Sequence, residues 1–259
     1  MKKLKALLQA SSLIQDLGFD TLNSLLYWRH NLRGNKIRKN YFVRASKLPP
    51  IILLQGFMGT RGVLLPLENH LRASGRDVIS IDFGFFNVSD IKGSAQLLSY
   101  KIERLLDRFS GIHNIQKIQI IGHSMGGLIG LYYVKKLGGH RIVDKLITLG
   151  APFNGTWTSL LGLFPFGVFS KGIWQMLPTS DFLKKLQKKT SEVYETEVIS
   201  ISAKYDSICP PKTCHLPGAT NEILNVGHAS LLMDKKVFDA IDRHLQEKES
   251  SARVVPIRK

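Results

Sequence analysis

The chain has 259 residues, 44% of them hydrophobic, so it can bury a large core and suits one α/β domain better than two small ones. Its 36 basic and 20 acidic residues give a net charge of +16, a balance that attracts anionic lipid or nucleic acid non-specifically. We do not expect nucleic acid as a partner, because the sequence has no zinc-finger spacing and no RNP-like aromatic strand.

The first segment, residues 1–48, is basic and amphipathic. Residues 1–50 hold ten Lys and Arg residues against two Asp residues, a net charge of +8. The leucines that recur there at helical spacing are Leu4, Leu7, Leu8, Leu22, Leu25 and Leu26. One or two helices are therefore predicted, which either pack on the domain or lie on an anionic membrane surface with Trp28 at its boundary.

No stretch approaches the roughly 18 to 20 consecutive apolar residues of a membrane-spanning helix. Polar residues interrupt the apolar start of the chain, and no convincing cleavage site follows. We therefore expect a cytoplasmic or peripherally membrane-associated protein, with export as the alternative.

Beyond residue 48, short apolar runs alternate with amphipathic ones, and a basic tail follows at 248–259. Buried strands are predicted within 49–57, 76–84, 115–124, 143–152, 196–206 and 221–228. Helices are predicted within 62–75, 94–109, 126–139 and 230–248. This alternation predicts an α/β domain over 49–247, in which helices cover both faces of a mostly parallel sheet.

The run Gly122-His123-Ser124-Met125-Gly126 has the pattern G-x-S-x-G, between a predicted strand and a predicted helix. A sharp strand-to-helix turn strains the serine backbone, and glycine on both sides removes the collisions that side chains would cause there. Ser124 is therefore predicted to be a nucleophile above the carboxyl edge of the sheet. The N–H of Met125 would begin the helix and face an oxyanion.

A serine nucleophile needs a base and an acid, which follow it in the chain in the order acid, then histidine. His228 ends a predicted buried strand and is the predicted base, whereas His123 is expected to be structural. Asp206 closes the preceding strand and is the predicted acid, because Asp144 precedes its strand and Asp181 starts or caps a helix. The remaining histidines are expected to be solvated.

The second oxyanion donor is predicted in the loop after the first core strand, where Gly56 lets the backbone turn and Phe57 N–H points at the developing charge. The alternative is an ordinary strand-exit turn.

Three motifs in order, "IGHSMGGLIGLYYVKKLGGHRIVDKLITLGAPFNGT", "SAKYDSI" and "NVGHASLL", resemble bacterial triacylglycerol lipases and esterases of the α/β-hydrolase superfamily over roughly residues 50–247. The resemblance implies the α/β-hydrolase fold, the triad of Ser124, Asp206 and His228, and Phe57 and Met125 as oxyanion donors. The chain departs from the family at Gln55, where His is usual before the glycine.

An apolar insertion, about 156–190, interrupts the alternation of strand and helix. Between Thr156 and Leu183, six of 28 residues are aromatic, as expected of a cap that binds substrate. The predicted cap residues are Trp157, Phe164, Phe166, Phe169 and Trp174, with Phe182 the sixth aromatic residue. The cap is either packed, a mobile lid that opens on lipid, or a surface that binds a partner.

These features predict a serine hydrolase that cleaves acyl esters or lipids through an acyl-enzyme and needs no metal or organic cofactor. An acyltransferase or thioesterase would use the same residues. A second class of function is a basic membrane-surface binding protein built on the same domain. Cys209 and Cys214 cannot form a disulfide framework and lack metal-ligand spacing, so two free thiols are expected, with a small local disulfide as the alternative.

Overall fold

The computed structural model describes residues 21–36, 48–84, 87, 89–109, 115–158, 170–188 and 196–252, without the side chains of 108–109 and 247–252. Predictions that concern 1–20, 253–259 and the cap residues Phe164, Phe166 and Phe169 lie outside this part of the chain. Within the described ranges, no helix is both long and apolar enough to cross a membrane.

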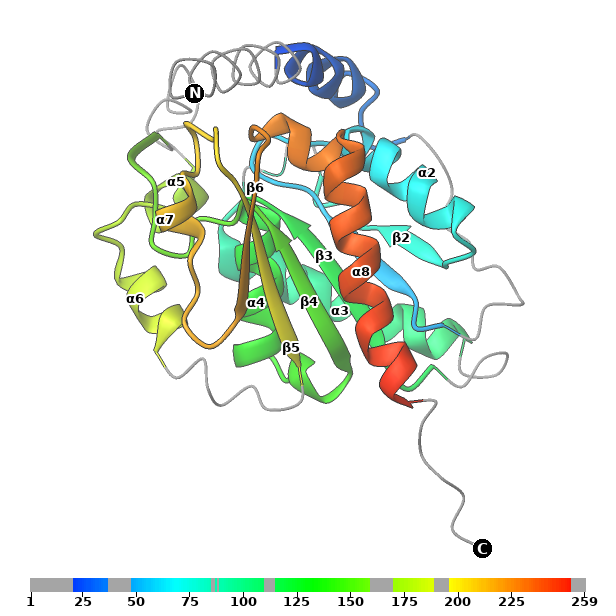
Figure 1. Cartoon of the computed structure of the whole chain (residues 1–259). Coiled ribbons are helices and arrows are strands. Elements are labelled where there is room, and N and C mark those ends of the chain that lie inside the picture. Colours follow the sequence, from blue (N-terminus) through cyan, green and yellow to red (C-terminus); the bar gives the residue numbers. More distant parts are fainter. Residues whose placement is uncertain are drawn as a thin grey trace, which may run out of the picture.

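The core of the molecule is a six-stranded sheet in which all strand pairs are parallel (Figure 1). The strands are β1 (Ile51–Leu54), β2 (Val78–Ser80), β3 (Ile118–His123), β4 (Val143–Leu149), β5 (Glu197–Ala203) and β6 (Thr220–Leu224). Their order is β2-β1-β3-β4-β5-β6. The chain adds β2 on one side of β1 and β3 on the other, so the strand order reverses between β1 and β3. In parallel sheets, ligands bind at the carboxyl ends of the strands near such a switch point.

Helices cover both faces of the sheet, as predicted. In β1, Ile51 and Leu53 pack into one hydrophobic core, and Ile52 and Leu54 pack into the other. The first core is closed by α2 (Leu65–Ala73) and α8 (Lys235–Ala252), the second by α3 (Ile91–Phe109) and α4 (Met125–Lys136). Because successive side chains of a strand point to opposite faces, continuous apolar strands require this double cover.

The prediction that the strand before His228 is buried is wrong. β6 is an edge strand of the described sheet, where it pairs with β5 alone, and it leaves Ile223 59% exposed. Burial of a strand depends on its place in the sheet, and the apolar residues of this run are too few to reveal an edge position. β6 still delivers His228 to the carboxyl edge, four residues after its end at Leu224.

The chain is helical over residues 21–31, and this helix lies across the carboxyl edge of the sheet (Figure 1). Asn23 Nδ2 donates to Ser230 Oγ at 2.9 Å, and Asn31 Nδ2 donates to the carbonyl of Met58 at 3.0 Å. Residues 21–36 are thus tied by hydrogen bonds to loops of the sheet domain.

The described part of the insertion is also packed. It contains α5 (Lys171–Gln175) and α6 (Asp181–Gln187), and Ile173 and Leu183 join the hydrophobic core that α3 and α4 close. The shorter elements are α7 (Pro211–Cys214), η1 (Arg61–Leu64), η3 (Gly139–Arg141) and η7 (Ala229–Leu232). α8 continues to Ala252 and so reaches into the predicted tail.

Candidate active site

Ser124 lies on the sharp turn between β3 and α4 and has a strained backbone. Its φ is 51° and its ψ is −122°, a conformation that residues other than glycine rarely adopt. Its N–H donates to the carbonyl of Leu149 at 2.8 Å, and its own carbonyl accepts from Gly127 N at 3.0 Å. The turn is therefore held by the neighbouring strand and by the first turn of α4.

Gly122 and Gly126 allow this turn by their lack of a side chain. A Cβ on Gly122 would lie 2.6 Å from the backbone of Gly126, and a Cβ on Gly126 would lie 2.5 Å from the carbonyl oxygen of Leu54. Both distances are shorter than real Cβ contacts, and both involve backbone atoms that cannot move aside. Glycine is required at the two positions for α4 to begin directly above β1 and β3.

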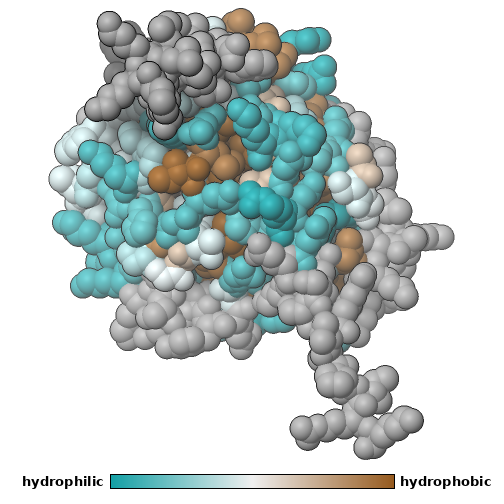
Figure 2. All heavy atoms as spheres, in the orientation of Figure 1, coloured by the Kyte–Doolittle hydropathy of each residue, from teal (hydrophilic) through white to brown (hydrophobic). Residues whose placement is uncertain are grey.

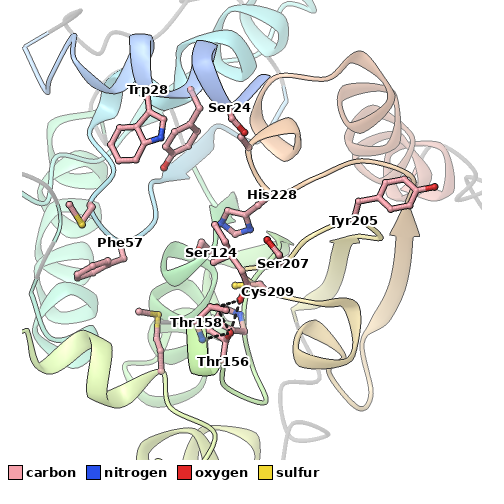
Figure 3. Close-up of a pocket in the computed structure, with 16 residues that line it drawn as sticks. Ser24, Trp28, Phe57, Ser124, Thr156, Thr158, Tyr205, Ser207, Cys209 and His228 are labelled. Atoms are coloured by element: carbon pink, nitrogen blue, oxygen red, sulfur yellow. Dashed lines mark hydrogen bonds between the residues drawn. The ribbon is translucent and has the colours of Figure 1, made fainter. Parts of the chain in front are cut away.

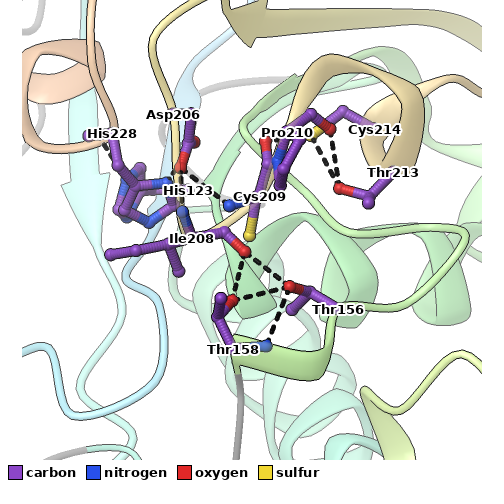
Figure 4. A network of polar contacts seen from close by, with 10 residues as sticks. All are labelled: His123, Thr156, Thr158, Asp206, Ile208, Cys209, Pro210, Thr213, Cys214 and His228. Atoms are coloured by element: carbon purple, nitrogen blue, oxygen red, sulfur yellow. Dashed lines mark hydrogen bonds and ion pairs between the residues drawn. The ribbon is translucent and has the colours of Figure 1, made fainter. Parts of the chain in front are cut away.

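Asp206 follows β5 and is buried, with each carboxylate oxygen bound (Figure 4). Oδ1 accepts hydrogen bonds from the backbone N–H groups of Ile208 at 2.8 Å and Cys209 at 2.7 Å. Oδ2 lies 2.5 Å from Nδ1 of His228. Burial alone would raise the pKa of Asp206, but His228 and the two N–H groups outweigh it and lower the pKa below its ordinary value.

The loop after Asp206 is fastened to the insertion. Thr156 Oγ1 and Thr158 Oγ1 both donate to the carbonyl of Ile208 at 2.5 Å (Figure 4). The insertion thereby also holds the loop that binds Oδ1 of Asp206, and Oδ2 remains directed at His228.

His123 is packed against His228, with 4.7 Å between the ring centroids. Burial, together with the neighbouring His228, lowers the pKa of His123 to about 3. Its Nε2 lies 3.4 Å from the carbonyl oxygen of His228. A ring that stays neutral at physiological pH suits a structural role beside the second imidazole, which is what the sequence predicts for it.

The loop after β1 lies against the serine. A Cβ on Gly56 would be 2.9 Å from Cβ of Ser124, so no other residue fits between the two backbones. Phe57 and Met58 line the same cavity as Ser124 and His228 (Figure 3). Met125 begins α4 directly after the serine, and its side chain is buried. The two predicted oxyanion residues therefore flank the serine from separate elements.

The cavity has a volume of about 560 Å³. Its lining comes from the helix at 21–31, the turn that carries Ser124, the insertion, and the loops after β1, β4, β5 and β6. Of the described residues, 16 line it, and none of these is Lys, Arg, Asp or Glu (Figure 3). Trp157 and Trp174 do not line it and are about half exposed, at 59% and 49%. The insertion contributes Thr156, Thr158 and Met176 to the lining instead.

Cys209 and Cys214 are free thiols, as predicted, and both are buried. Cys209 lines the cavity. Burial, and then the charge of Asp206, raise the pKa of Cys209 well above its ordinary value, although the Ser124 hydroxyl lies within hydrogen-bonding reach and opposes the shift. Cys209 is therefore a neutral thiol next to the candidate nucleophile.

Within the described ranges, Asp206, Cys209 and His228 are the one group of metal-ligand types whose ligand atoms all lie within 4.8 Å of one another. Asp206 is already bonded at both oxygens, and the Cys209 thiol resists deprotonation. Metals bind deprotonated cysteine, so this donor set does not suit a metal ion.

Comparison with known proteins agrees with this architecture. Residues 49–174 match the family model described as alpha/beta hydrolase fold. The mature form of the lipase BlEst2 of Bacillus licheniformis has a similar structure, with a TM-score of 0.65, 17% identity, and coverage of 82% of this chain and 96% of that one. The chain has the α/β-hydrolase fold. The resemblance predicted from the sequence is confirmed at this level.

Two further similar proteins are informative. Lipase B of Aspergillus fumigatus gives a TM-score of 0.62 at 16% identity, over 78% of this chain and 53% of its own. The protein named carbamate hydrolase RutD of Cronobacter turicensis is 27% identical over 111 residues. That match spans 42% of this chain and 40% of the relative. Together with the family model, these similarities support a hydrolase.

Some residues of the site carry no sequence signal. Ser24, Tyr27 and Trp28 line the cavity from the helix at 21–31, which the sequence presents only as a basic amphipathic segment. Cys209 could have been found, because it follows Asp206 by three residues in a loop at the carboxyl edge. His244, expected to be solvated, is instead buried and lies 2.7 Å from Glu222, away from this site.

Proposed function

We propose that this α/β hydrolase is a serine hydrolase that cleaves uncharged acyl esters through a triad of Ser124, His228 and Asp206. The observation that carries the proposal is the 2.5 Å contact between Asp206 and Nδ1 of His228 at the rim of the cavity that contains Ser124. The strained backbone of Ser124 supports it, since such strain is common at catalytic residues.

In the proposed reaction, His228 takes the proton of Ser124 as the hydroxyl attacks the ester carbonyl. The Asp206 carboxylate accepts a hydrogen bond from Nδ1–H, which holds the ring with Nε2 free to act as the base and stabilises the imidazolium. The N–H groups of Phe57 and Met125 hold the tetrahedral oxyanion, and His228 then returns the proton to the leaving alcohol. In the second half of the reaction, His228 takes a proton from the water molecule that attacks the acyl-enzyme, and then returns it to Ser124 as the acid is released.

The lining of the cavity supports an uncharged substrate. An ionised substrate group would be desolvated there without a charged partner among the described residues, because none of those that line the space is Lys, Arg, Asp or Glu. The polar side-chain groups of the lining are hydroxyls, the Trp28 indole N–H, the Cys209 thiol and the His228 imidazole, and the other lining side chains are apolar. An acyl chain and a neutral alcohol suit this composition better than a charged metabolite does.

The test is hydrolysis of p-nitrophenyl esters from acetate to palmitate by the wild type, Ser124→Ala and the matched variant Ser74→Ala, whose serine is exposed at the end of α2. The proposal expects activity in the wild type and Ser74→Ala and background rates in Ser124→Ala. Equal rates in all three proteins would refute it. Addition of an alcohol or thiol acceptor, and of a neutral carbamate, tests acyl transfer and the activity named for the Cronobacter relative.

We further propose that the helix at 21–31 contacts an anionic lipid surface. Its side chains Leu22, Leu25 and Trp28, with Leu32 just beyond, are more than half exposed. Figure 2 shows hydrophobic side chains at the top of the molecule, where this helix lies. Arg29 and Arg33 are exposed beside them, and the net charge of +16 favours anionic lipid.

Vesicle sedimentation tests this contact. Neutral vesicles and vesicles with anionic lipid are compared at low and high salt for the wild type, for the double variant Leu25→Ser/Leu32→Ser, and for Ile223→Ser as an exposed apolar control on β6. We expect binding to anionic vesicles that high salt weakens and that only the double variant loses. Vesicle binding that is unchanged by high salt and by the double substitution would contradict the proposed contact.

A further inference from the structure

The loop after β1, residues 55–60, is held by a residue that belongs to none of the predicted motifs. Asn87 is fully buried, and its Nδ2 donates to two carbonyl oxygens of this loop, those of Gln55 at 3.0 Å and Gly56 at 3.2 Å. The two partners lie 32 and 31 residues before it in the chain. Asn87 therefore fixes two successive peptide groups of the loop.

The second of these peptide groups is the one that matters chemically. The carbonyl of Gly56 and the N–H of Phe57 belong to the same planar trans peptide, in which the two groups point in opposite directions. The Gly56 oxygen is held on one side by Asn87 and by the N–H of Gly59 at 3.2 Å. The orientation of the Phe57 N–H follows from that anchor, on the side of the loop away from Asn87.

The backbone of Asn87 is itself strained. Among the described residues other than glycine, positive φ occurs at Met58 (54°), Asn87 (41°) and Ser124 (51°). Met58 belongs to the loop and Ser124 packs against it, so the strain is gathered around one peptide segment. Strain of this kind persists only where the surrounding structure enforces it, and it is commonly associated with function.

A packing role does not explain the choice of asparagine. The Oδ1 of Asn87 has no hydrogen-bond partner in the described structure, so burying this amide leaves one polar atom unpaired, which costs stability. The side-chain amide of Gln55 likewise has no partner there, so the side chain that stands where the family usually has histidine does not anchor the loop. Among the described residues, the side chain of Asn87 hydrogen-bonds only through Nδ2, and both bonds are with the loop.

We propose that Asn87 is a positioning residue, which holds the Gly56–Phe57 peptide so that the Phe57 N–H faces the oxyanion formed at Ser124. This inference rests on the proposed esterase function. It assigns Asn87 to transition-state stabilisation and not to substrate binding, because Asn87 does not line the cavity.

The variants Asn87→Ala and Asn87→Gly test it. Both lack the donor, and glycine tolerates the positive φ, so the second variant separates the amide from backbone strain. We expect kcat for a p-nitrophenyl ester to fall about 10- to 10²-fold in both, with KM changed less than about threefold. The ³¹P resonance of the phosphonyl adduct on Ser124 should also shift, since it reports hydrogen bonding to the adduct oxygen.

Asn31→Ala is the matched comparator, because Asn31 is also buried and donates to the same loop, but at the carbonyl of Met58. It should lose thermal stability with a smaller loss of kcat than Asn87→Gly. A wild-type enzyme that is active and depends on Ser124, combined with unchanged kcat in both Asn87 variants, would overturn the inference alone. An equal loss of kcat in Asn31→Ala, or a rise in KM alone, would also overturn it. A wild type without Ser124-dependent activity would instead refute the proposed function.

Discussion

Asp206 Oδ2 and His228 Nδ1 lie 2.5 Å apart, although 22 residues separate them in the chain. The contact arises because β5 and β6 are neighbouring parallel strands whose carboxyl ends open onto the same rim. With Oδ1 of Asp206 held by two backbone N–H groups, the carboxylate has one orientation available, and that orientation fixes the imidazole.

Replacing this carboxylate by an amide is expected to abolish most activity. Asp206→Asn presents either an amide oxygen or an amide N–H to Nδ1, and the second choice imposes the wrong tautomer on His228. We expect kcat to fall about 10³- to 10⁴-fold with the fold intact, as measured by ester hydrolysis and circular dichroism. Asp181→Asn, at the exposed start of α6, is the control. A loss of less than tenfold in Asp206→Asn would show that Asp206 is not the acid of the triad.

The buried, neutral His123 predicts a pH-dependent stability. The unfolded chain binds a proton at this histidine near pH 6.5, whereas the folded protein does so only near pH 3. The contribution of this group to the free energy of unfolding is therefore fully present above about pH 6.5 and is lost progressively as the pH falls toward 3.

Urea unfolding of the wild type and His123→Leu between pH 7.5 and 4 measures this effect. The stability of the wild type relative to the variant should decline by several kcal/mol over that range. A constant difference would show that His123 titrates normally in the folded protein.

The turn that carries Ser124 should not accept a methyl group. Gly126→Ala places a Cβ 2.5 Å from the carbonyl of Leu54, and relieving the clash would displace α4 from the sheet. We expect a loss of about 3 kcal/mol or more in the free energy of unfolding, together with loss of activity. Gly93→Ala in α3 is the comparison, since its Cβ meets only the Asp90 side chain, at 3.1 Å. Similar stability of the two variants would contradict the described turn.

The thiols of the two cysteines should be unreactive in the native protein. Burial raises the pKa of Cys214 to about 12 and that of Cys209 well above its ordinary value, and only thiolates react readily. An aromatic disulfide reagent at pH 8 should therefore find no reactive thiol in the native state and two in urea. Rapid reaction of one native thiol would show that the cavity exposes Cys209 as a thiolate.

The parts of the site that lie at strand ends could be predicted from the sequence. Ser124, Asp206 and His228 each follow an apolar run, and parallel strands bring their carboxyl ends to one rim, so periodicity and order suffice to place them together. Gly122 and Gly126 could also be predicted, because a sharp strand-to-helix turn requires glycine on both sides of the serine. The exposure of β6 could not be predicted, because strand order is a property of the whole sheet and no local pattern encodes it.

Residues that act from other elements are harder to predict. Asn87 and Tyr27 reach the site through the packing of a loop and of the helix at 21–31, and neither is part of a recognisable spacing. The density of aromatic residues in the insertion predicts Trp157 as a substrate-binding residue of the cap. Trp157 does not line the cavity, because composition does not determine which side of a segment faces it. The hydroxyls of its neighbours Thr156 and Thr158 bind the loop after Asp206 instead.

The most direct measurement of the central claim is covalent labelling of the native protein with a fluorophosphonate, followed by peptide mass spectrometry. We predict one adduct, on the peptide that contains Ser124, formed in the wild type, strongly slowed in Asp206→Asn and absent in Ser124→Ala. Labelling that persists in Ser124→Ala, or a wild type that remains unlabelled while folded, would contradict the assignment of Ser124 as an activated nucleophile.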